Sequence, residues 1–180
     1  MNNIYYFIRH AHSSYTPDEI NRPLSDKGQA SLAQLEFLTD KSIAAIYSSP
    51  YRRAIQTVEP LAQSLKLAIQ TDKRLIERKL SSQAIADPDF EQCLMKLWSQ
   101  PTFSLVDGES NQQAQQRALA LLHELESKHQ NEEIIISSHG NLICILLSAF
   151  DSRIDYNFWR SLSMPDVLVL DKNGNISRLL

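Results

Sequence analysis

Two short runs of apolar residues limit what this chain can fold into more than any other feature of its sequence. Residues 134–136 are three consecutive isoleucines, and residues 4–8 read IYYFI. Runs of this length without polar alternation are typical of strands buried on both faces of a parallel sheet. Helical patterns separate them from each other and from a third run, residues 43–47. This alternation predicts an α/β fold, a three-layer sandwich with a mostly parallel central sheet and helices on both faces.

Helix-capping residues and apolar periodicity predict the other elements. Ser25 is a suitable N-cap, and Leu32, Leu35 and Leu38 recur after it at helical spacing. The last two strands are joined through Asn173-Gly174 and should form a hairpin at the sheet edge. The sequence predicts helices after Ser25, Pro50 and Ser110 and over residues 87–98 and 142–150, and further strands over residues 67–71, 167–170 and 176–179.

Length and charge restrict the classes of partner. A chain of 180 residues suits one domain, so residues 1–180 are expected to form a single unit. A net charge of −3 provides no broad positive field, which argues against nucleic acid and anionic membrane surfaces as partners. The sequence contains no apolar run of membrane-spanning length and no signal-peptide pattern, and Cys93 and Cys144 lie in apolar surroundings. We therefore expect a cytoplasmic protein with free thiols.

Histidines and arginines follow the predicted strands. Arg9 and His10 come directly after the first run, and His139 follows the isoleucine-rich run. Because parallel strands present their C-terminal ends along one edge, the two imidazoles should meet there. Arg53 lies in the first turn of the helix after Pro50, where a helix N-terminus already favours an anion. Guanidinium groups pair bidentately with phosphate oxygens, so this combination indicates a phosphate site.

Four motifs resemble, in chain order, those of the histidine phosphatase or phosphoglycerate mutase-like superfamily. They are Arg9-His10-Ala11, residues 48–57 (SSPYRRAIQT), Leu75-Ile76-Glu77 and Ser138-His139-Gly140. The resemblance implies that His10 is a nucleophile that forms a phosphohistidine, and that Arg9, Arg53 and His139 hold the phosphoryl oxygens. It also makes Glu77 the general acid and base, with no metal and no cofactor. The nearby arginines suit this role, because they favour a neutral imidazole at His10.

Two positions qualify the resemblance. Taken alone, Glu77 is flanked by basic residues and suggests a surface ion pair. Ala11 stands where the signature usually has glycine, and it would cost about 1 kcal/mol if that turn requires a positive φ.

The expected activity is hydrolysis of a phosphomonoester or of a protein phosphohistidine. A cofactor-dependent phosphoglycerate mutase is the alternative, but it needs additional cations between the acid loop and the second histidine. Residues 78–138 contain few bases, so water is the favoured acceptor.

Two interpretations belong to other classes. A metal hydrolase would use His10, His12, His139 and Glu77 as ligands, but the adjacent arginines would repel a divalent cation. A catalytically idle phosphate-binding or interaction module remains open, although no member of the catalytic set is missing.

The polar loop after His12 contains Asn21 and Arg22, which are candidates for substrate contacts; the alternative is a solvated loop. Neither the oligomeric state nor the substrate, a small molecule or a phosphoprotein, follows from the sequence.

Overall fold

The computed structural model describes residues 1–82 and 87–180. Its elements, in chain order, are β1 (Ile4–Arg9), α1 (Asp26–Ala30), η1 (Ser31–Asp40), β2 (Ile43–Ser48), α2 (Arg52–Leu65), β3 (Ile69–Thr71), η2 (Lys73–Leu75), α3 (Asp87–Ser99), α4 (Asn111–Lys128), β4 (Glu133–Ser138), α5 (Gly140–Leu147), α6 (Tyr156–Arg160), β5 (Asp166–Leu170) and β6 (Ile176–Arg178).

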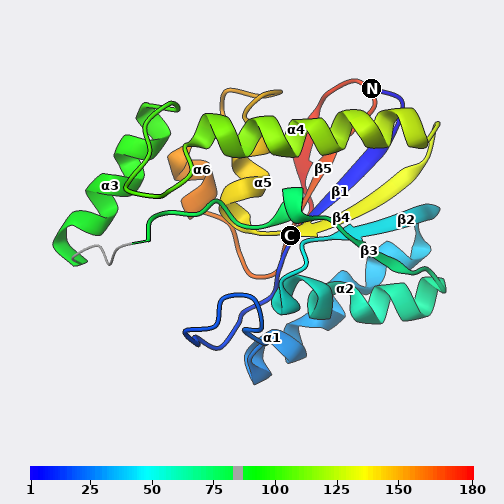
Figure 1. The fold of residues 1–180 in the computed structure, drawn as a ribbon. Coiled ribbons are helices and arrows are strands. Elements are labelled where there is room, and N and C mark those ends of the chain that lie inside the picture. The colour runs from blue at the N-terminus through cyan, green and yellow to red at the C-terminus, as the bar shows by residue number, and fades with distance from the viewer. Residues whose placement is uncertain (83–86) are drawn as a thin grey trace.

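A six-stranded sheet forms the centre of the described fold, in the order β3-β2-β4-β1-β5-β6. The first four strands of that order are parallel, whereas β5 runs antiparallel to β1 and forms a hairpin with β6 at the edge. The predicted α/β class and the closing hairpin are therefore confirmed. The isoleucine-rich β4 lies next to β1 near the middle of the sheet (Figure 1), as its unbroken apolar run predicted.

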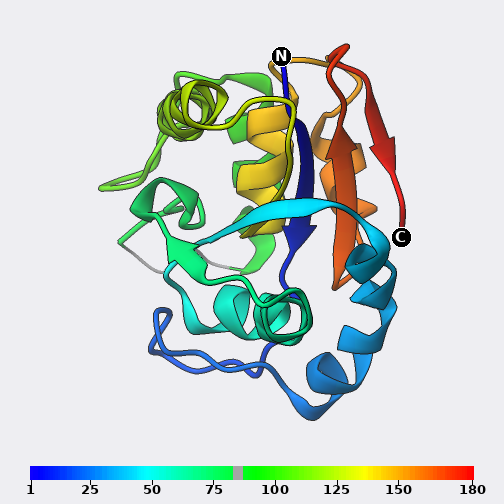
Figure 2. The ribbon, with the colours of Figure 1, turned by 90° about the vertical axis from the view of Figure 1, so that its right-hand side faces the viewer.

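Helices cover both faces of the sheet (Figures 1 and 2), because successive side chains of each strand point to opposite sides. On one face, Tyr5 and Phe7 pack with the apolar residues of α4 and α5. On the other, Tyr6 and Ile8 pack with those of η1 and α2. Both faces of β1 are thus buried, which fixes the direction in which its C-terminal end points.

The helix predicted after Ser25 is divided in two. Ser25 caps α1 as expected, with its Oγ accepting from the amide of Gly28. The following residues form a 3-10 helix, η1, rather than a continuous α-helix. The strict spacing of three between Leu32, Leu35 and Leu38 suits the three residues per turn of that helix type. None of the described helices is long and apolar enough to cross a membrane.

Candidate active site

The ends of β1 and β4 bring two histidines together, as the sequence predicted. Arg9 pairs with Ser138 in the sheet register, and the amide of His10 donates to the carbonyl of Ser138 at 3.0 Å. The ring centroids of His10 and His139 are 5.2 Å apart. Arg53, in the first turn of α2, contacts both imidazoles. Three of the four predicted phosphate-site residues therefore form one contiguous cluster.

The hydrogen bonds of His10 fix its tautomer. Its Nδ1 lies 2.7 Å from the carbonyl oxygen of Ala11, which only accepts, so Nδ1 carries the proton. Its Nε2 accepts from Nε of Arg53 at 3.1 Å. The lone pair on Nε2 therefore faces the guanidinium that would bind an anion.

His139 has the opposite tautomer from His10. Its Nδ1 lies 3.3 Å from Nη2 of Arg53, which only donates, so Nδ1 is the acceptor. Its Nε2 therefore donates to Oγ of Ser49 at 2.9 Å. Ser49 begins the turn between β2 and α2, so His139 is held by the segment that also positions Arg53. The imidazole of His139 is completely buried.

Burial and charge keep both imidazoles neutral. Burial is the main cause that lowers the pKa of His10 to about 3. The hydrogen bond to Ala11 is the next largest effect and opposes it, and the charges of Arg53 and then Arg9 lower the pKa further. The pKa of His139 is also lowered, first by burial and then by His10 and Arg53. A neutral imidazole with a free lone pair is the form that acts as a nucleophile.

Arg9 reaches the site along the first turn of α5. Its Nη1 donates to the carbonyl of Leu162 at 2.8 Å, while its buried Nε has no hydrogen-bond partner among the described residues. A Cβ at Gly140 would lie 2.7 Å from this Nε. Glycine after His139 therefore lets the Arg9 side chain lie against the start of the helix.

Glu77 is not the surface ion pair that its sequence neighbours suggest. Its Oε1 accepts from the amides of Arg78 at 2.8 Å and Leu142 at 3.0 Å, and its Oε2 from the amide of Asn141 at 3.4 Å. The carboxylate thus lies at the N-terminus of α5, beside His139. Burial raises the pKa of Glu77, and this effect exceeds the opposing one of the charge on Arg78 and the amide donors.

Arg117 holds the backbone that leads to Glu77, a role that sequence reasoning missed. Its Nη1 donates to the carbonyl of Arg74 at 2.5 Å and its Nη2 to that of Ile76 at 3.0 Å. Glu109 pairs with the same guanidinium through both carboxylate oxygens, at 2.6 and 2.8 Å. Oγ of Ser138 binds the intervening carbonyl of Leu75 at 2.7 Å. Three successive carbonyls before Glu77 are therefore held by side chains.

The alanine at position 11 fits its turn without strain. Ala11 is not among the described residues with positive φ. It is completely buried, and its amide donates to Oγ1 of Thr57 at 3.0 Å. Glycine is therefore not needed at this position.

The 13–22 loop carries the two candidate substrate contacts, Asn21 and Arg22, and the carboxylate of Glu19. The side-chain amide of Asn21 donates to the carboxylate of Asp18 at 2.7 Å, and this side chain is exposed. Nη2 of Arg22 lies 3.4 Å from Oε2 of Glu19, and the same Oε2 lies 3.0 Å from Nη1 of Arg53. Sequence reasoning did not find Glu19, because no periodicity or motif distinguishes it within an exposed loop.

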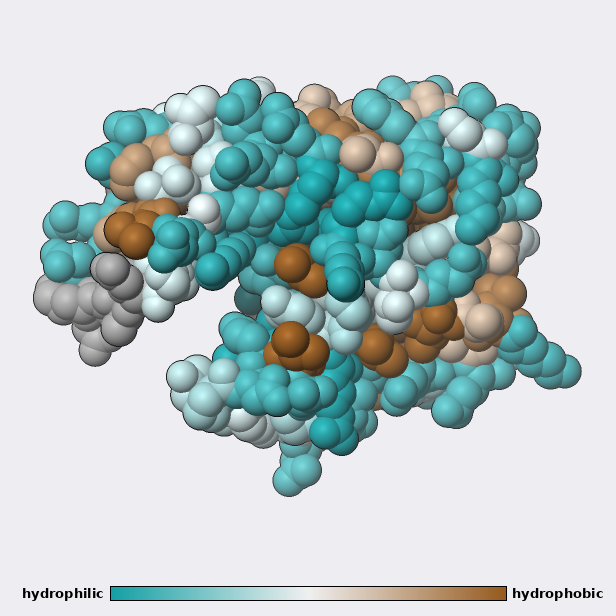
Figure 3. All heavy atoms as spheres, in the orientation of Figure 1, coloured by the Kyte–Doolittle hydropathy of each residue, from teal (hydrophilic) through white to brown (hydrophobic). Residues whose placement is uncertain are grey.

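A surface hollow lies between the end of the molecule that carries α3 and the part that carries the 13–22 loop (Figure 3), and β1 runs toward it (Figure 1). In His12, just before that loop, Nδ1 lies 2.7 Å from Oγ of Ser25.

Among the described residues, no group of three or more histidine, cysteine, aspartate or glutamate side chains is arranged to hold a metal ion.

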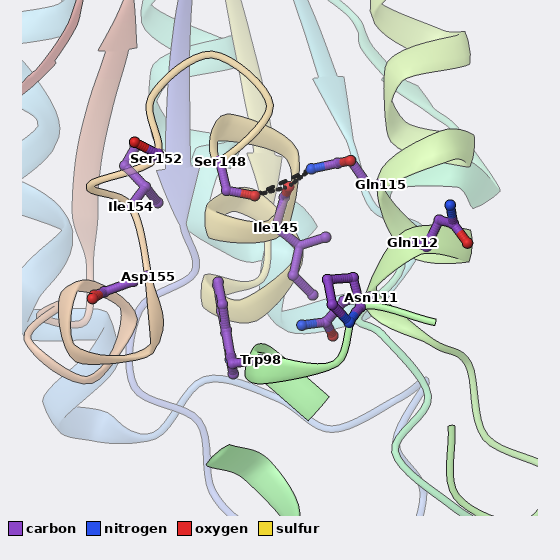
Figure 4. Close-up of a pocket in the computed structure, with 10 residues that line it drawn as sticks. Trp98, Asn111, Gln112, Gln115, Ile145, Ser148, Ser152, Ile154 and Asp155 are labelled. Carbon is purple, nitrogen blue, oxygen red and sulfur yellow. Dashed lines mark hydrogen bonds between the residues drawn. The ribbon is translucent and has the colours of Figure 1, made fainter. Parts of the chain in front are cut away.

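A separate cavity of about 390 Å³ lies among α3, α4, α5 and the segment before α6 (Figure 4). Trp98, Ile145 and Ile154 supply its apolar lining. The side-chain amide of Gln115 donates to the carbonyl of Ile145 at 2.7 Å and to Oγ of Ser148 at 3.1 Å. None of the predicted site residues lines this cavity, so it is distinct from the histidine cluster.

Comparison with known proteins agrees with this geometry. The model of the histidine phosphatase superfamily (branch 1) matches residues 5–171. A Hydrogenobacter thermophilus protein named "Putative phosphoserine phosphatase 2" is 27% identical over 157 residues, covering 78% of this chain and 77% of its own. Phosphoglycerate mutase-like protein 4 of Arabidopsis thaliana is 25% identical, over 76% of this chain and 66% of its own.

Solved structures share the fold. A mycobacterial glucosyl-3-phosphoglycerate phosphatase has a TM-score of 0.79 at 21% identity, covering 98% of this chain and 97% of its own. YhfR of Bacillus stearothermophilus has a TM-score of 0.79 at 23% identity, covering 99% of this chain and 96% of its own.

Proposed function

Because the chain belongs to the histidine phosphatase superfamily, we propose that it is a metal-independent phosphatase that hydrolyses a phosphomonoester through a phosphohistidine at His10. In this proposal Arg9, Arg53 and His139 bind the phosphoryl group, and Glu77 is the general acid and base. Relatives whose names refer to phosphoserine and glucosyl-3-phosphoglycerate phosphatases support this reaction class.

The first half-reaction begins at Nε2 of His10. When the Nε–H of Arg53 turns from the lone pair on Nε2 to a phosphoryl oxygen, the lone pair attacks phosphorus. Nδ1 keeps its proton and its hydrogen bond to the carbonyl of Ala11, so the ring needs no change of tautomer. Arg53 is placed to hold the phosphoryl oxygens, because its Nε already lies 3.1 Å from the attacking nitrogen. Fixed guanidinium charges offset the charge on the transferring group without reorganisation.

Glu77 supplies the proton that the leaving oxygen needs. Its raised pKa favours the protonated form that a general acid requires, and burial is the main cause. In the second half-reaction the resulting carboxylate takes a proton from water, which attacks phosphorus and releases His10. Asn21 and Arg22 are assigned to contacts with the part of the substrate outside the phosphoryl group, because their loop borders Arg53 through Glu19.

The observation that carries the proposal is the contact between Arg53 and Nε2 of His10, at 3.1 Å. It is tested by rapid quenching after mixing the protein with a ³²P-labelled phosphomonoester. We expect acid-labile, base-stable label on His10, formed and lost at rates that account for turnover. Catalytic turnover without this label contradicts the mechanism, and neither label nor turnover is the result expected of an idle phosphate-binding module.

The substrate and the acceptor are tested on the same preparation. A panel of phosphorylated metabolites and one phosphohistidine protein, assayed for released phosphate, separates small-molecule from protein substrates. Phosphoglycerate mutase turnover far above the rate of hydrolysis would favour the mutase alternative. Full activity in the presence of a chelator is expected, and loss of activity that a divalent metal restores would favour a metal hydrolase.

A further inference from the structure

Glu19 is a carboxylate beside the proposed phosphoryl site with no part in the proposed reaction. Its Oε2 lies 3.0 Å from Nη1 of Arg53 and 3.4 Å from Nη2 of Arg22. The side chain of Glu19 is 55% exposed, whereas that of Arg53 is 4% exposed. Glu19 therefore lies on the solvent side of the guanidinium that contacts His10 and His139 from within.

The backbone at Glu19 is tied to the N-terminus of α2. Nη1 of Arg53 donates to the carbonyl of Glu19 at 2.7 Å, and the amide of Arg52 donates to the carbonyl of Ile20 at 2.9 Å. The carboxylate of Asp18 accepts from the amide of Ile20 at 3.1 Å and so closes the turn. Since the backbone is held, a displaced Glu19 carboxylate moves only as far as its own side chain reaches.

A phosphoryl group held by Arg53 beside His10 would lie close to this carboxylate, and the two anions repel each other. We propose that Glu19 is a specificity-determining residue that favours phosphomonoesters with a protonated amine near the phosphate and disfavours those with a second anionic group. This inference rests on the proposed function, since it requires a phosphoryl group on Arg53.

Arg22 does not cancel the effect of the Glu19 charge on the substrate, because its guanidinium also binds other groups. Its Nη2 donates to the carbonyl of Thr16 at 3.2 Å, and its Cζ lies 4.9 Å from the ring centroid of Tyr15. Its distance to Glu19, 3.4 Å, is longer than the 3.0 Å between Arg53 and Glu19. A protonated substrate amine beside Glu19 would lie close to its half-exposed carboxylate, whereas a second anionic group there would be repelled by it.

Three esters of nearly equal size test the inference: 2-aminoethyl phosphate, 2-hydroxyethyl phosphate and phosphoglycolate. They carry a cation, a neutral group and an anion at the same distance from phosphorus. In the wild-type protein kcat/KM should fall in that order. Glu19→Gln should reduce the ratio of the first to the third by about tenfold, because an attraction and a repulsion across partly exposed groups are both removed. Glu19→Lys should reverse the order.

The matched control is Glu59→Gln, which removes one exposed carboxylate further along α2 and should leave the ratio unchanged. Thermal unfolding of each variant shows that the fold is retained. Hydrolysis with an unchanged ratio in Glu19→Gln overturns this inference alone, and so does an equal gain for all three esters, which would mark Glu19 as a simple competitor. If no ester is hydrolysed and no phosphohistidine forms, the proposed function fails and this inference with it.

Discussion

The histidines at the ends of β1 and β4 and Glu19 of the 13–22 loop contact the same guanidinium, that of Arg53, but they are held in different ways. His139 is completely buried between Arg53 and Ser49, and His10 continues a strand that is covered on both faces. Glu19 contacts Arg53 from an exposed turn that is closed mainly by its own residues.

This difference in how the two regions are held matches two roles in the proposed reaction, acting on the phosphoryl group and selecting the substrate. In the proposed reaction, the two imidazoles that meet the phosphoryl group lie on strand ends, where sheet register and two packed faces leave them little freedom. Groups that meet the variable part of a substrate lie on a loop, which tolerates change. Substitutions at the strand ends should therefore lower kcat, whereas those in the loop should mainly alter KM and preference.

Replacing the strand-end histidine, His10, or the nearby loop histidine, His12, should give the largest difference in kcat. His10→Ala removes the proposed nucleophile and is expected to lower kcat by about 10⁴-fold or more, with loss of the phosphohistidine label. His12→Ala, two residues further along, removes an imidazole that is bound to Ser25. It should change kcat by less than about threefold, as is usual for a side chain outside the reacting groups. Equal losses in the two variants would refute the division.

Glu77→Gln should give the next largest effect. The amide keeps the size of the carboxyl group but transfers no proton, so hydrolysis of an alkyl phosphate should fall by about 10²-fold to 10³-fold. An activated aryl phosphate, whose leaving group needs no proton, should lose far less. The measurement is kcat/KM for a series of esters against the pKa of the leaving alcohol. A uniform loss across the series would mean that Glu77 is not the acid.

The pH dependence tests whether the strand-end imidazole is neutral. If the nucleophilic histidine had the ordinary pKa near 6.5, only about one thirtieth of it would be neutral at pH 5. Since burial and Arg53 lower the pKa of His10 to about 3, its neutral form should persist over this range. Phosphoenzyme formation, corrected for ionisation of the substrate phosphate, should therefore not fall as the pH is lowered from 7 to 5. The alkaline limb, assigned to the raised pKa of Glu77, should vanish in Glu77→Gln.

Arg117→Lys tests how firmly Glu77, the proposed general acid, is positioned. Lysine keeps the charge but cannot bind the carbonyls of Arg74 and Ile76 together with Glu109, so Glu77 should be held less precisely. We expect about a tenfold loss for alkyl phosphates with the same leaving-group pattern as Glu77→Gln. Arg153→Lys, in an exposed pair with Asp151, is the control. A loss that is equal for all leaving groups would indicate lowered stability instead.

The sequence was sufficient to predict the sheet, the meeting of the histidines and the placement of Arg53. Those features depend on local signals: unbroken apolar runs in β1 and β4, and a proline before the first turn of α2. The roles of the residues remain a proposal, but their convergence follows from strand direction alone.

What the sequence could not predict depends on contacts between distant segments. The surroundings of Glu77 come from amides of α5, more than sixty residues further along. Arg117 binds its carbonyl partners about forty residues back along the chain, so no local pattern marks it. The contact between Glu19 and Arg53 depends on how an irregular loop folds back, and η1 differs from the expected helix through hydrogen bonding that apolar periodicity does not report.

Substitutions at the two proposed loop contacts should have the smallest effects. Arg22→Ala removes a cation whose partners are Glu19, the carbonyl of Thr16 and the Tyr15 ring. It should raise KM by about threefold to fivefold and change kcat by less than about twofold, because a partly exposed ion pair contributes little. Asn21→Ala should have less effect still, since its exposed amide is bound to Asp18. Steady-state kinetics on one ester, with the ³²P label as a check on the chemical step, measures both. A fall in kcat as large as that of Glu77→Gln would place this loop among the groups that act on phosphorus and remove the distinction between the two regions.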